Sequence, residues 1–272
     1  MDKQEGGWKL LYRDKGFSDS QPVVTIITAV FNSALFFEET ILSIVSQTYS
    51  NLEYIVVDGG STDGTLDIIK KYDNQIAYWV SEPDAGISDA FNKAIELSTG
   101  SYINFQGAGD LLETTGVLES VFSDLKNYPS FISGRIKRVD AQDSNKVYYL
   151  SDDFTRKKFK SSSLFWKMSL PHQGLFTHRS YFEHYGLFNT SLRYSMDYEH
   201  LLRSYHEFPE IIFTDVVSRW RADGLGNNKE LEIYREYDLI KRMHKIESSY
   251  QLLLVNWFIL FKHKIKCILL NR

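Results

Sequence analysis

Short apolar runs alternate with amphipathic segments over the first half of this 272-residue chain, and this alternation limits the fold more than any other feature. Runs rich in β-branched residues lie at 23–30, 53–58, 76–80 and 102–105. Segments with helical spacing of apolar residues lie between them, at 35–45, 66–72 and 86–97. Strands joined by helices pair in parallel, so we expect an α/β fold with a mostly parallel central sheet and helices on both faces.

The second half of the chain is less regular. We expect two strands within 131–150, a mobile loop over 152–163, a helix over 197–205, a strand over 211–217 and a helix over 229–246. No change of composition marks a second domain. We therefore expect a loose N-terminal arm (1–21), a single domain (22–248) and a C-terminal amphipathic segment (249–272).

Composition and charge exclude several classes of protein. The chain has 31 Lys and Arg against 35 Asp and Glu, a net charge of −4 that disfavours nucleic acid as a partner. The single cysteine, Cys267, excludes an intramolecular disulfide and a cysteine-based zinc cluster. The longest apolar stretch, 252–261, is half of the roughly 20 residues that span a membrane, and 1–21 lacks the apolar region of a signal peptide. We expect a cytoplasmic chain.

Acidic residues follow three of the predicted strands. Asp58 and Asp110 come directly after strands, and Glu82 and Asp84 lie just beyond a third. Ligands of parallel sheets bind at the carboxyl ends of the strands. Because carboxylates gathered there repel one another without a cation or hydrogen-bond donors, the pattern favours a metal or polar-ligand site over a solvated edge.

Five stretches now identify a resemblance. They lie in order at 25–32, 53–65, 81–93, 100–110 and, in two parts, 171–174 with 196–199. In sequence and spacing they resemble the family 2 glycosyltransferases of GT-A fold, particularly bacterial members that build exopolysaccharide, capsule or lipopolysaccharide. The resemblance implies a nucleotide-sugar half (22–112) and an acceptor half (113–248). It also implies inverting transfer of a sugar from a nucleotide diphosphate, with UDP favoured, to a glycan or polyprenyl-linked acceptor.

The resemblance places the nucleoside on the first half of the chain. Asp58 matches the acid that reads the base, Thr28 and Asn32 match residues lining the same pocket, and Asp84 and Asp89 match positions near base and ribose. Two simpler alternatives stay open. Asp58 is also a suitable turn-forming acid before two glycines, and Asp89 also fits the solvated face of its helix.

Asp110 matches the last acid of the family's metal-binding motif, which implies Mg²⁺ or Mn²⁺ as cofactor. The preceding acid of the usual motif is replaced here by Gly109. This departure motivates a second interpretation, a catalytically weak sugar-nucleotide-binding subunit that needs a partner. A simpler role for Asp110 is to cap the turn at 111–112.

On the acceptor side, the resemblance makes Asp197 the candidate general base, with Glu199 as the fallback. An acid in the first turn of a helix also stabilises that helix, which is the alternative. Asn92, His172 and Arg221 are candidates to contact the donor sugar or its phosphates. A packed histidine and an arginine at a solvated strand end are the corresponding alternatives.

The end of the chain combines apolar and basic residues. Trp257 lies in an apolar run that is followed by lysines, a pattern typical of segments that lie in a membrane interface. We expect peripheral contact of 250–272 with the inner face of the cytoplasmic membrane. A helix packed on the domain or in a homodimer is the alternative. A dehydrogenase is disfavoured because no G-x-G-x-x-G follows the first strand.

Overall fold

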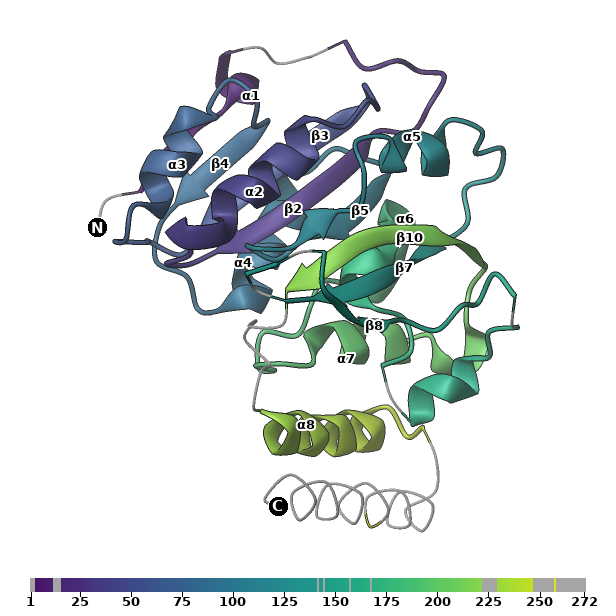
Figure 1. Cartoon of the computed structure of the whole chain (residues 1–272). Helices are drawn as coiled ribbons and strands as arrows, with labels where there is room; N and C mark the ends of the chain where they lie inside the picture. The colour runs from purple at the N-terminus through teal and green to yellow at the C-terminus, as the bar shows by residue number, and fades with distance from the viewer. Residues whose placement is uncertain are drawn as a thin grey trace.

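The predicted alternation of strands and helices forms the centre of the fold (Figure 1). The computed structural model describes residues 3–11, 16–140, 142–143, 145–156, 158–166, 168–221, 229–246 and 257. The four predicted strands are β2 (Val24–Val30), β3 (Leu52–Asp58), β4 (Tyr78–Ser81) and β5 (Tyr102–Phe105). They pair in parallel in the order β4-β3-β2-β5. The connecting helices are α2 (Ala34–Val45), α3 (Thr65–Lys71) and α4 (Ile87–Leu97), so this part of the prediction is confirmed.

Helices cover both faces of these parallel strands. Alternate residues of a strand point to opposite faces, so Ile26 of β2 packs in a core with α2 and α3, whereas Ile27 packs in a second core with α4. Both isoleucines are fully buried. Burial on both faces is why the strands read as continuous apolar runs.

The second half of the chain extends the same sheet with mixed strand directions. β9 (Leu175–His178) is antiparallel to β5 and to β7 (Phe131–Val139), and β10 (Ile211–Arg221) is parallel to β7. The short strands β6 (Leu111–Leu112) and β8 (Val147–Leu150) pair with β10 and β7. The two strands expected within 131–150 are therefore confirmed. The strand expected at 211–217 continues to Arg221.

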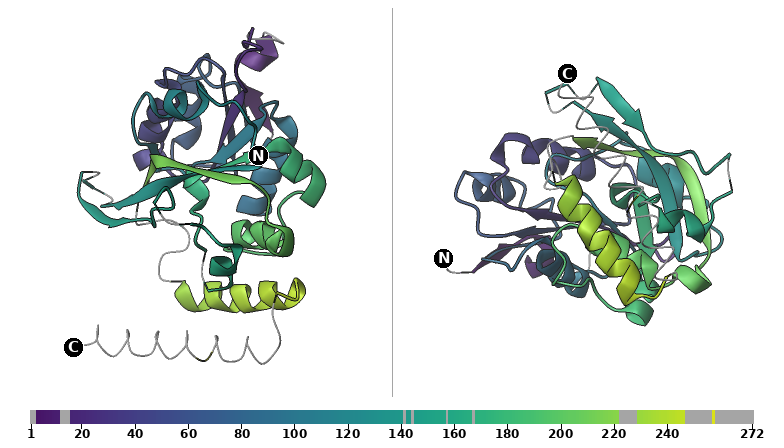
Figure 2. Two further views of the ribbon diagram at one scale, coloured as in Figure 1. Left: turned by 90° about the vertical axis from the view of Figure 1, so that its right-hand side faces the viewer. Right: turned by 90° about the horizontal axis from the view of Figure 1, so that it is seen from below.

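Short helices accompany this half of the sheet. They are α5 (Val117–Phe122), α6 (Arg179–Tyr185), α7 (Met196–Leu202) and α8 (Glu230–Met243), with 3-10 turns η1 (Ser161–Phe165), η2 (His172–Gly174) and η3 (Tyr205–Glu207). Figure 2 shows α7 between the sheet and α8. The expected loop before η1 does not pack loosely throughout, because Phe154 and Phe159 contact the core on the α4 side.

The predicted loose arm at 1–21 is wrong for residues 4–11. β1 (Gln4–Gly6) adds an antiparallel strand to β4, and the following turn of helix, α1 (Trp8–Leu11), buries Trp8. Lys9 forms an ion pair with the buried carboxylate of Glu53. The arm is therefore fixed by a backbone ladder, an apolar anchor and a buried charge pair.

The C-terminal segment 249–272 lies outside the described residues except for Trp257, which is exposed. Within the part of the chain that is described, no helix is both long and apolar enough to cross a bilayer.

Candidate functional site

The end of β3 holds Asp58 inside a network of serine hydroxyls. Its carboxylate is fully buried and accepts hydrogen bonds from the Ser61 amide (3.1 Å), the Ser61 hydroxyl and the Ser81 hydroxyl (2.6 Å). These bonds occupy both carboxylate oxygens and shape the turn after β3. The geometry matches the turn-forming alternative, and contact with a base stays a prediction.

Thr28 and Asn32 take different positions from those expected of pocket-lining residues. Thr28 is fully buried within β2, where its hydroxyl accepts a hydrogen bond from Tyr54 (3.2 Å). Asn32 adopts φ 47° and accepts a hydrogen bond from the Thr62 amide (2.9 Å), which joins the loops after β2 and β3. Thr28 presents no surface to a nucleotide, whereas Asn32 joins two loops at the edge of the sheet where ligands of parallel sheets bind.

Asp84 and Asp89 both hold the turn before α4. Asp84 accepts a hydrogen bond from the Gly86 amide (2.8 Å), and Asp89 accepts one from the Ala85 amide (3.1 Å). Asp89 also lies 3.3 Å from the Lys93 ammonium. Hydrogen-bond donors thus satisfy both acids, and neither is simply a solvated residue.

Asn92 connects α4 to the second half of the chain. Its side-chain amide donates to the Phe188 carbonyl (2.9 Å) and accepts from the Phe188 amide (2.9 Å). This reciprocal pair uses the functional groups that the predicted contact with donor sugar would need. The structure assigns Asn92 a structural role in joining the halves, and its predicted role has no support in the geometry.

Phe31 is a candidate residue that the sequence reasoning missed. It follows β2 directly, and its side chain is 61% exposed. A Cβ atom at Gly59 would lie 3.3 Å from the Phe31 ring and 2.8 Å from the Asp84 carboxylate. Because glycine has no Cβ atom, the space between these two side chains is not filled at this position. The signal was available: a large apolar residue directly after a strand, at the ligand-binding edge.

Asp110 is buried and accepts hydrogen bonds from its own loop and from two distant segments. Its carboxylate accepts hydrogen bonds from the Gly107 amide (3.0 Å), the Gln173 side-chain amide (3.2 Å) and the Arg221 amide (3.3 Å). Gly109 has φ 105°, a left-handed conformation that side chains adopt at a cost. The departure from the usual motif therefore has a backbone reason, because an acid at this position would be strained.

Arg221 lies beside Asp110 and is buried, so the alternative of a solvated strand end is wrong for it. Its guanidinium pairs with Glu39 and lies 4.4 Å from the centroid of the Phe36 ring. The Arg221 backbone thus contacts the acid expected to bind the metal, and its guanidinium is held by Glu39 and Phe36.

The donor set at Asp110 fits a hard cation only in part. A carboxylate oxygen suits Mg²⁺ or Mn²⁺, and such ions are often held by one or two carboxylates together with substrate phosphates. No group of three or more acidic, histidine or cysteine side chains that could hold a metal occurs among the described residues. The residues thus fit a cation that a diphosphate helps to bind, and not one held by protein ligands alone.

A cleft of about 380 Å³ is lined by residues of β7, β8, β10, η2 and α7. Asp197, in the first turn of α7, lines it together with His172 and Gln173 of η2. Gln173 is also the residue that donates to Asp110. A residue that contacts the candidate metal site therefore lines the same cleft as the candidate base, although Asp110 and Asp197 are 87 positions apart in the sequence.

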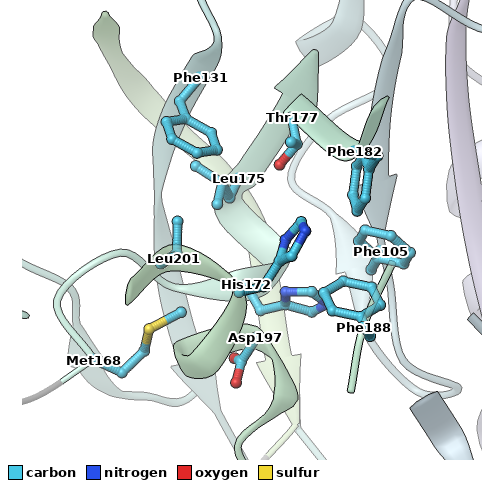
Figure 3. A pocket seen from close by; sticks show the side chains of 11 residues that line it. Phe105, Phe131, Met168, His172, Leu175, Thr177, Phe182, Phe188, Asp197 and Leu201 are labelled. Carbon is cyan, nitrogen blue, oxygen red and sulfur yellow. The ribbon is translucent and has the colours of Figure 1, made fainter. Parts of the chain in front are cut away.

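His172 lies between this cleft and a small cavity of about 10 Å³, enough for about one water (Figure 3). Its ring stacks on Phe105 at 4.8 Å, and its Nε2 atom is buried without a hydrogen-bond partner among the described residues. Burial lowers the pKa of His172, and the nearby Asp197 opposes this shift. His172 is thus packed, as the simpler alternative expects, and it also borders the cleft. Its contact with the donor sugar or its phosphates stays a prediction.

Glu199, the fallback base, is committed to holding α7 against α8. It is buried and accepts hydrogen bonds from Arg203 (2.6 Å and 3.0 Å) and from His244 (2.8 Å). Burial would raise the pKa of Glu199, but the hydrogen bonds from His244 and Arg203 lower it to about 2. A carboxylate held this way is a poor proton acceptor, so Asp197 is the better candidate.

The family model "Glycosyl transferase family 2" matches residues 25–186, more than half of the chain. An uncharacterised glycosyltransferase of Rickettsia typhi is 31% identical over 65% of this chain and 57% of its own length. The putative teichuronic acid biosynthesis glycosyltransferase TuaG of Bacillus subtilis is 37% identical over 33% of this chain and 37% of its own length. The chain thus spans little more than half of the Rickettsia protein.

Solved structures show the same fold. S. aureus TarS 1–349 in complex with UDP-GlcNAc has a TM-score of 0.65 at 14% identity, covering 88% of this chain and 72% of that one. The mannosyltransferase PcManGT of Pyrobaculum calidifontis, in complex with GDP-Man and Mn²⁺, has a TM-score of 0.56 at 22% identity, covering 88% and 67%. The GT-A fold predicted from the sequence is confirmed.

Proposed function

Because the chain belongs to the family 2 glycosyltransferases, we propose that it transfers a sugar from a nucleotide diphosphate sugar to a glycan or polyprenyl-linked acceptor, with inversion at the anomeric carbon. UDP is the favoured nucleotide, since the TarS structure contains UDP-GlcNAc. Cell-surface polysaccharide is the favoured product class, since TuaG carries the name of a teichuronic acid enzyme.

The observation that carries the proposal is the hydrogen bond from Gln173 to Asp110 (3.2 Å), because Gln173 and Asp197 line the same cleft. A transferase must neutralise a diphosphate and deprotonate an acceptor hydroxyl at neighbouring points. Asp110 and Arg221 serve the diphosphate, and Asp197 accepts the proton of the acceptor hydroxyl.

The proposed reaction assigns one task to each group. Asp197 accepts the proton of the acceptor hydroxyl as its oxygen bonds to the anomeric carbon, and the bond to the diphosphate breaks on the opposite face. Asp110 would hold Mg²⁺ or Mn²⁺, which supplies positive charge to the leaving diphosphate when bound. The exposed Phe31 ring offers a stacking surface to the base, near Asp84 and the loop built by Asn32.

Nucleotide binding is the first test. UDP, GDP and dTDP are titrated by calorimetry, with and without Mn²⁺, into the wild type, Asp110→Asn and the control Asp67→Asn, an exposed acid in the first turn of α3. We expect one nucleotide to bind, Mn²⁺ to strengthen it, and only Asp110→Asn to weaken it, by about tenfold or more.

The alternative of a binding subunit predicts a different pair of results. It rests on Gly109, which replaces an acid of the usual motif. A binding subunit would hold the nucleotide yet release none from any sugar donor when assayed alone. Failure of every nucleotide to bind would contradict both functions.

Sedimentation of the chain with and without 250–272 tests the proposed membrane contact, because deletion of this segment should release the chain from vesicles of anionic lipid.

A further inference from the structure

The outward face of α8 carries apolar and basic side chains that the proposed reaction does not use. Five residues of this helix are exposed, three apolar and two basic: Leu231, Arg235, Leu239, Arg242 and Met243. Their spacing places them on one side of the helix, and we call this set the α8 stripe. Leu239 and Met243 are 51% and 50% exposed. Large apolar side chains gathered on one exposed face indicate a contact surface.

Charged residues around the stripe differ in exposure by sign. From 229 to 246, the exposed charged residues are all basic: Lys229, Arg235, Arg242 and Lys245. The four acids of α8 are partly buried. Glu236 accepts hydrogen bonds from the amides of residues 193 and 194, Glu232 lies 3.5 Å from Lys229, and Asp238 pairs with Arg242 (2.9 Å). The charge that α8 presents to solvent is therefore mainly positive, although the whole chain carries −4.

The 3-10 turn η1 packs against the C-terminal end of α8 and adds side chains of the same kind. The buried ammonium of Lys241 lies 5.2 Å from the centre of the buried Phe165 ring. The next residue, Trp166, is 55% exposed, and Lys160, directly before η1, is also exposed. Tryptophan beside lysine and arginine is typical of surfaces that lie at a membrane interface.

The positive charge discriminates among the possible occupants of this face. Segment 250–272 has no Asp or Glu and several basic residues, so it is a poor electrostatic match for the stripe. A second copy bound through the same face would bring arginines against arginines. An anionic lipid surface complements the charge. It also accepts the apolar residues, because leucine and methionine enter the acyl boundary while arginine keeps its guanidinium at the phosphates.

We infer that the α8 stripe, together with Lys160 and Trp166 of the η1 region, is a lipid-contact surface for the anionic face of a membrane. It goes beyond the proposed function and the proposed contact through 250–272, since it assigns a second contact to the folded domain itself. Stable attachment takes two weak signals, so loss of either one should release the chain. Met168, two residues after Trp166, lines the cleft of Asp197, so this contact would hold the cleft near the bilayer.

The first experiment asks whether α8 itself touches lipid. The full chain carries Cys267→Ser and one new cysteine, Leu239→Cys on α8 or the control Leu42→Cys on α2, labelled with a polarity-sensitive fluorophore. Leu42 is 46% exposed, and Figure 1 shows α2 and α8 at opposite ends of the molecule. With vesicles of phosphatidylcholine and phosphatidylglycerol in equal parts, we expect a blue shift from the Leu239 site only. Vesicles of phosphatidylcholine alone should give a much smaller shift.

Variants of the full chain without label measure the contribution of each kind of residue by vesicle sedimentation. Leu239→Asp should weaken binding to the anionic vesicles about tenfold or more, whereas Leu42→Asp should leave it unchanged. Arg235→Gln should weaken it about fivefold, whereas Lys126→Gln, at an exposed lysine outside this surface, should not. Circular dichroism confirms that each variant is folded.

Four results would overturn the inference. They are no binding to anionic vesicles, equal binding to neutral vesicles, equal affinity of the α8 variants and their controls, and a bound chain whose Leu239 site stays in water, which would leave 250–272 as the whole attachment. Self-association that Leu239→Asp abolishes would assign the face to a second copy, with the same consequence. UDP is titrated into the same proteins, so that failure of the proposed function is seen separately from failure of the lipid contact.

Discussion

The carboxylates in the two halves of the candidate site differ in their surroundings. In the nucleotide half, Asp58, Asp84 and Asp89 accept hydrogen bonds from residues within a few positions or at the next strand end. In the acceptor half, Asp197 accepts a bond from the following amide (2.7 Å) and borders an open cleft. The comparison indicates that the first set of acids mainly builds loops, whereas Asp197 borders the cleft in which the proposed reaction needs a base.

The largest expected effect tests this difference directly. Asp197→Asn should lower turnover of the donor by about 10²–10⁴-fold, since it removes the proton acceptor, while the dissociation constant of UDP stays unchanged. Asp215→Asn is the matched control, because exposed Asp215 also accepts a bond from the next amide (2.9 Å). Equal turnover in the two variants would break the comparison.

Glu199 is two residues from Asp197 but should affect stability and not chemistry. Glu199→Gln should lower the free energy of unfolding by about 3 kcal/mol, because it leaves Arg203 and His244 partly unpaired in a buried position. Urea unfolding measures this. Glu232→Gln, at a half-buried acid of α8 that lies 3.5 Å from Lys229, should change the free energy of unfolding by less than about 0.5 kcal/mol.

The same residue gives a pH dependence of defined sign. The pKa of Glu199 is lowered from 4.5 to about 2 in the folded chain, so its contribution is present above the unfolded pKa and is lost as pH falls from 4.5 toward 2. Wild-type stability should therefore decline over this window, and the decline should be smaller in Glu199→Gln. Parallel acid titrations of the two proteins would contradict this assignment.

Restoring the missing acid should not restore a metal site. Gly109→Asp should destabilise the chain by about 1–2 kcal/mol because Gly109 has φ 105°, and it should not strengthen Mn²⁺-dependent binding of UDP. Gly116→Asp is the control, since Gly116 has an ordinary φ of −103° at the start of α5. Tighter Mn²⁺-dependent binding in Gly109→Asp would show that the backbone is not the reason for the glycine.

The smallest effect concerns the exposed ring at the nucleotide side. Phe31→Ala should raise the dissociation constant of UDP about tenfold, through lost stacking, with no change in thermal stability. Leu35→Ala on α2 is the control because its side chain is 80% exposed and has no predicted contact with nucleotide. Equal affinities would remove Phe31 from the proposed site.

Local pattern was enough to predict the parallel sheet, its three connecting helices and the acids at the strand ends. It failed at residues 4–11, where Trp8 and Lys9 dock on partners that lie far along the chain. Local pattern also predicted that Thr28 and Asn92 contact the ligand, whereas in the fold they form hydrogen bonds with Tyr54 and Phe188. A polar residue near a strand end has several partners within reach, and only packing selects among them.

The sequence by itself determined the fold class, because strand and helix periodicity and turn chemistry act over neighbouring residues. Its five motifs, by their order and spacing, indicated the family. Only the tertiary structure decided which polar groups meet. It joined Asp110 to Gln173, placed Arg221 beside them and brought Tyr149 and Trp220 to the cleft of Asp197. These contacts cross between segments whose relative positions depend on the register of β5, β9, β7 and β10, and no local pattern encodes that register.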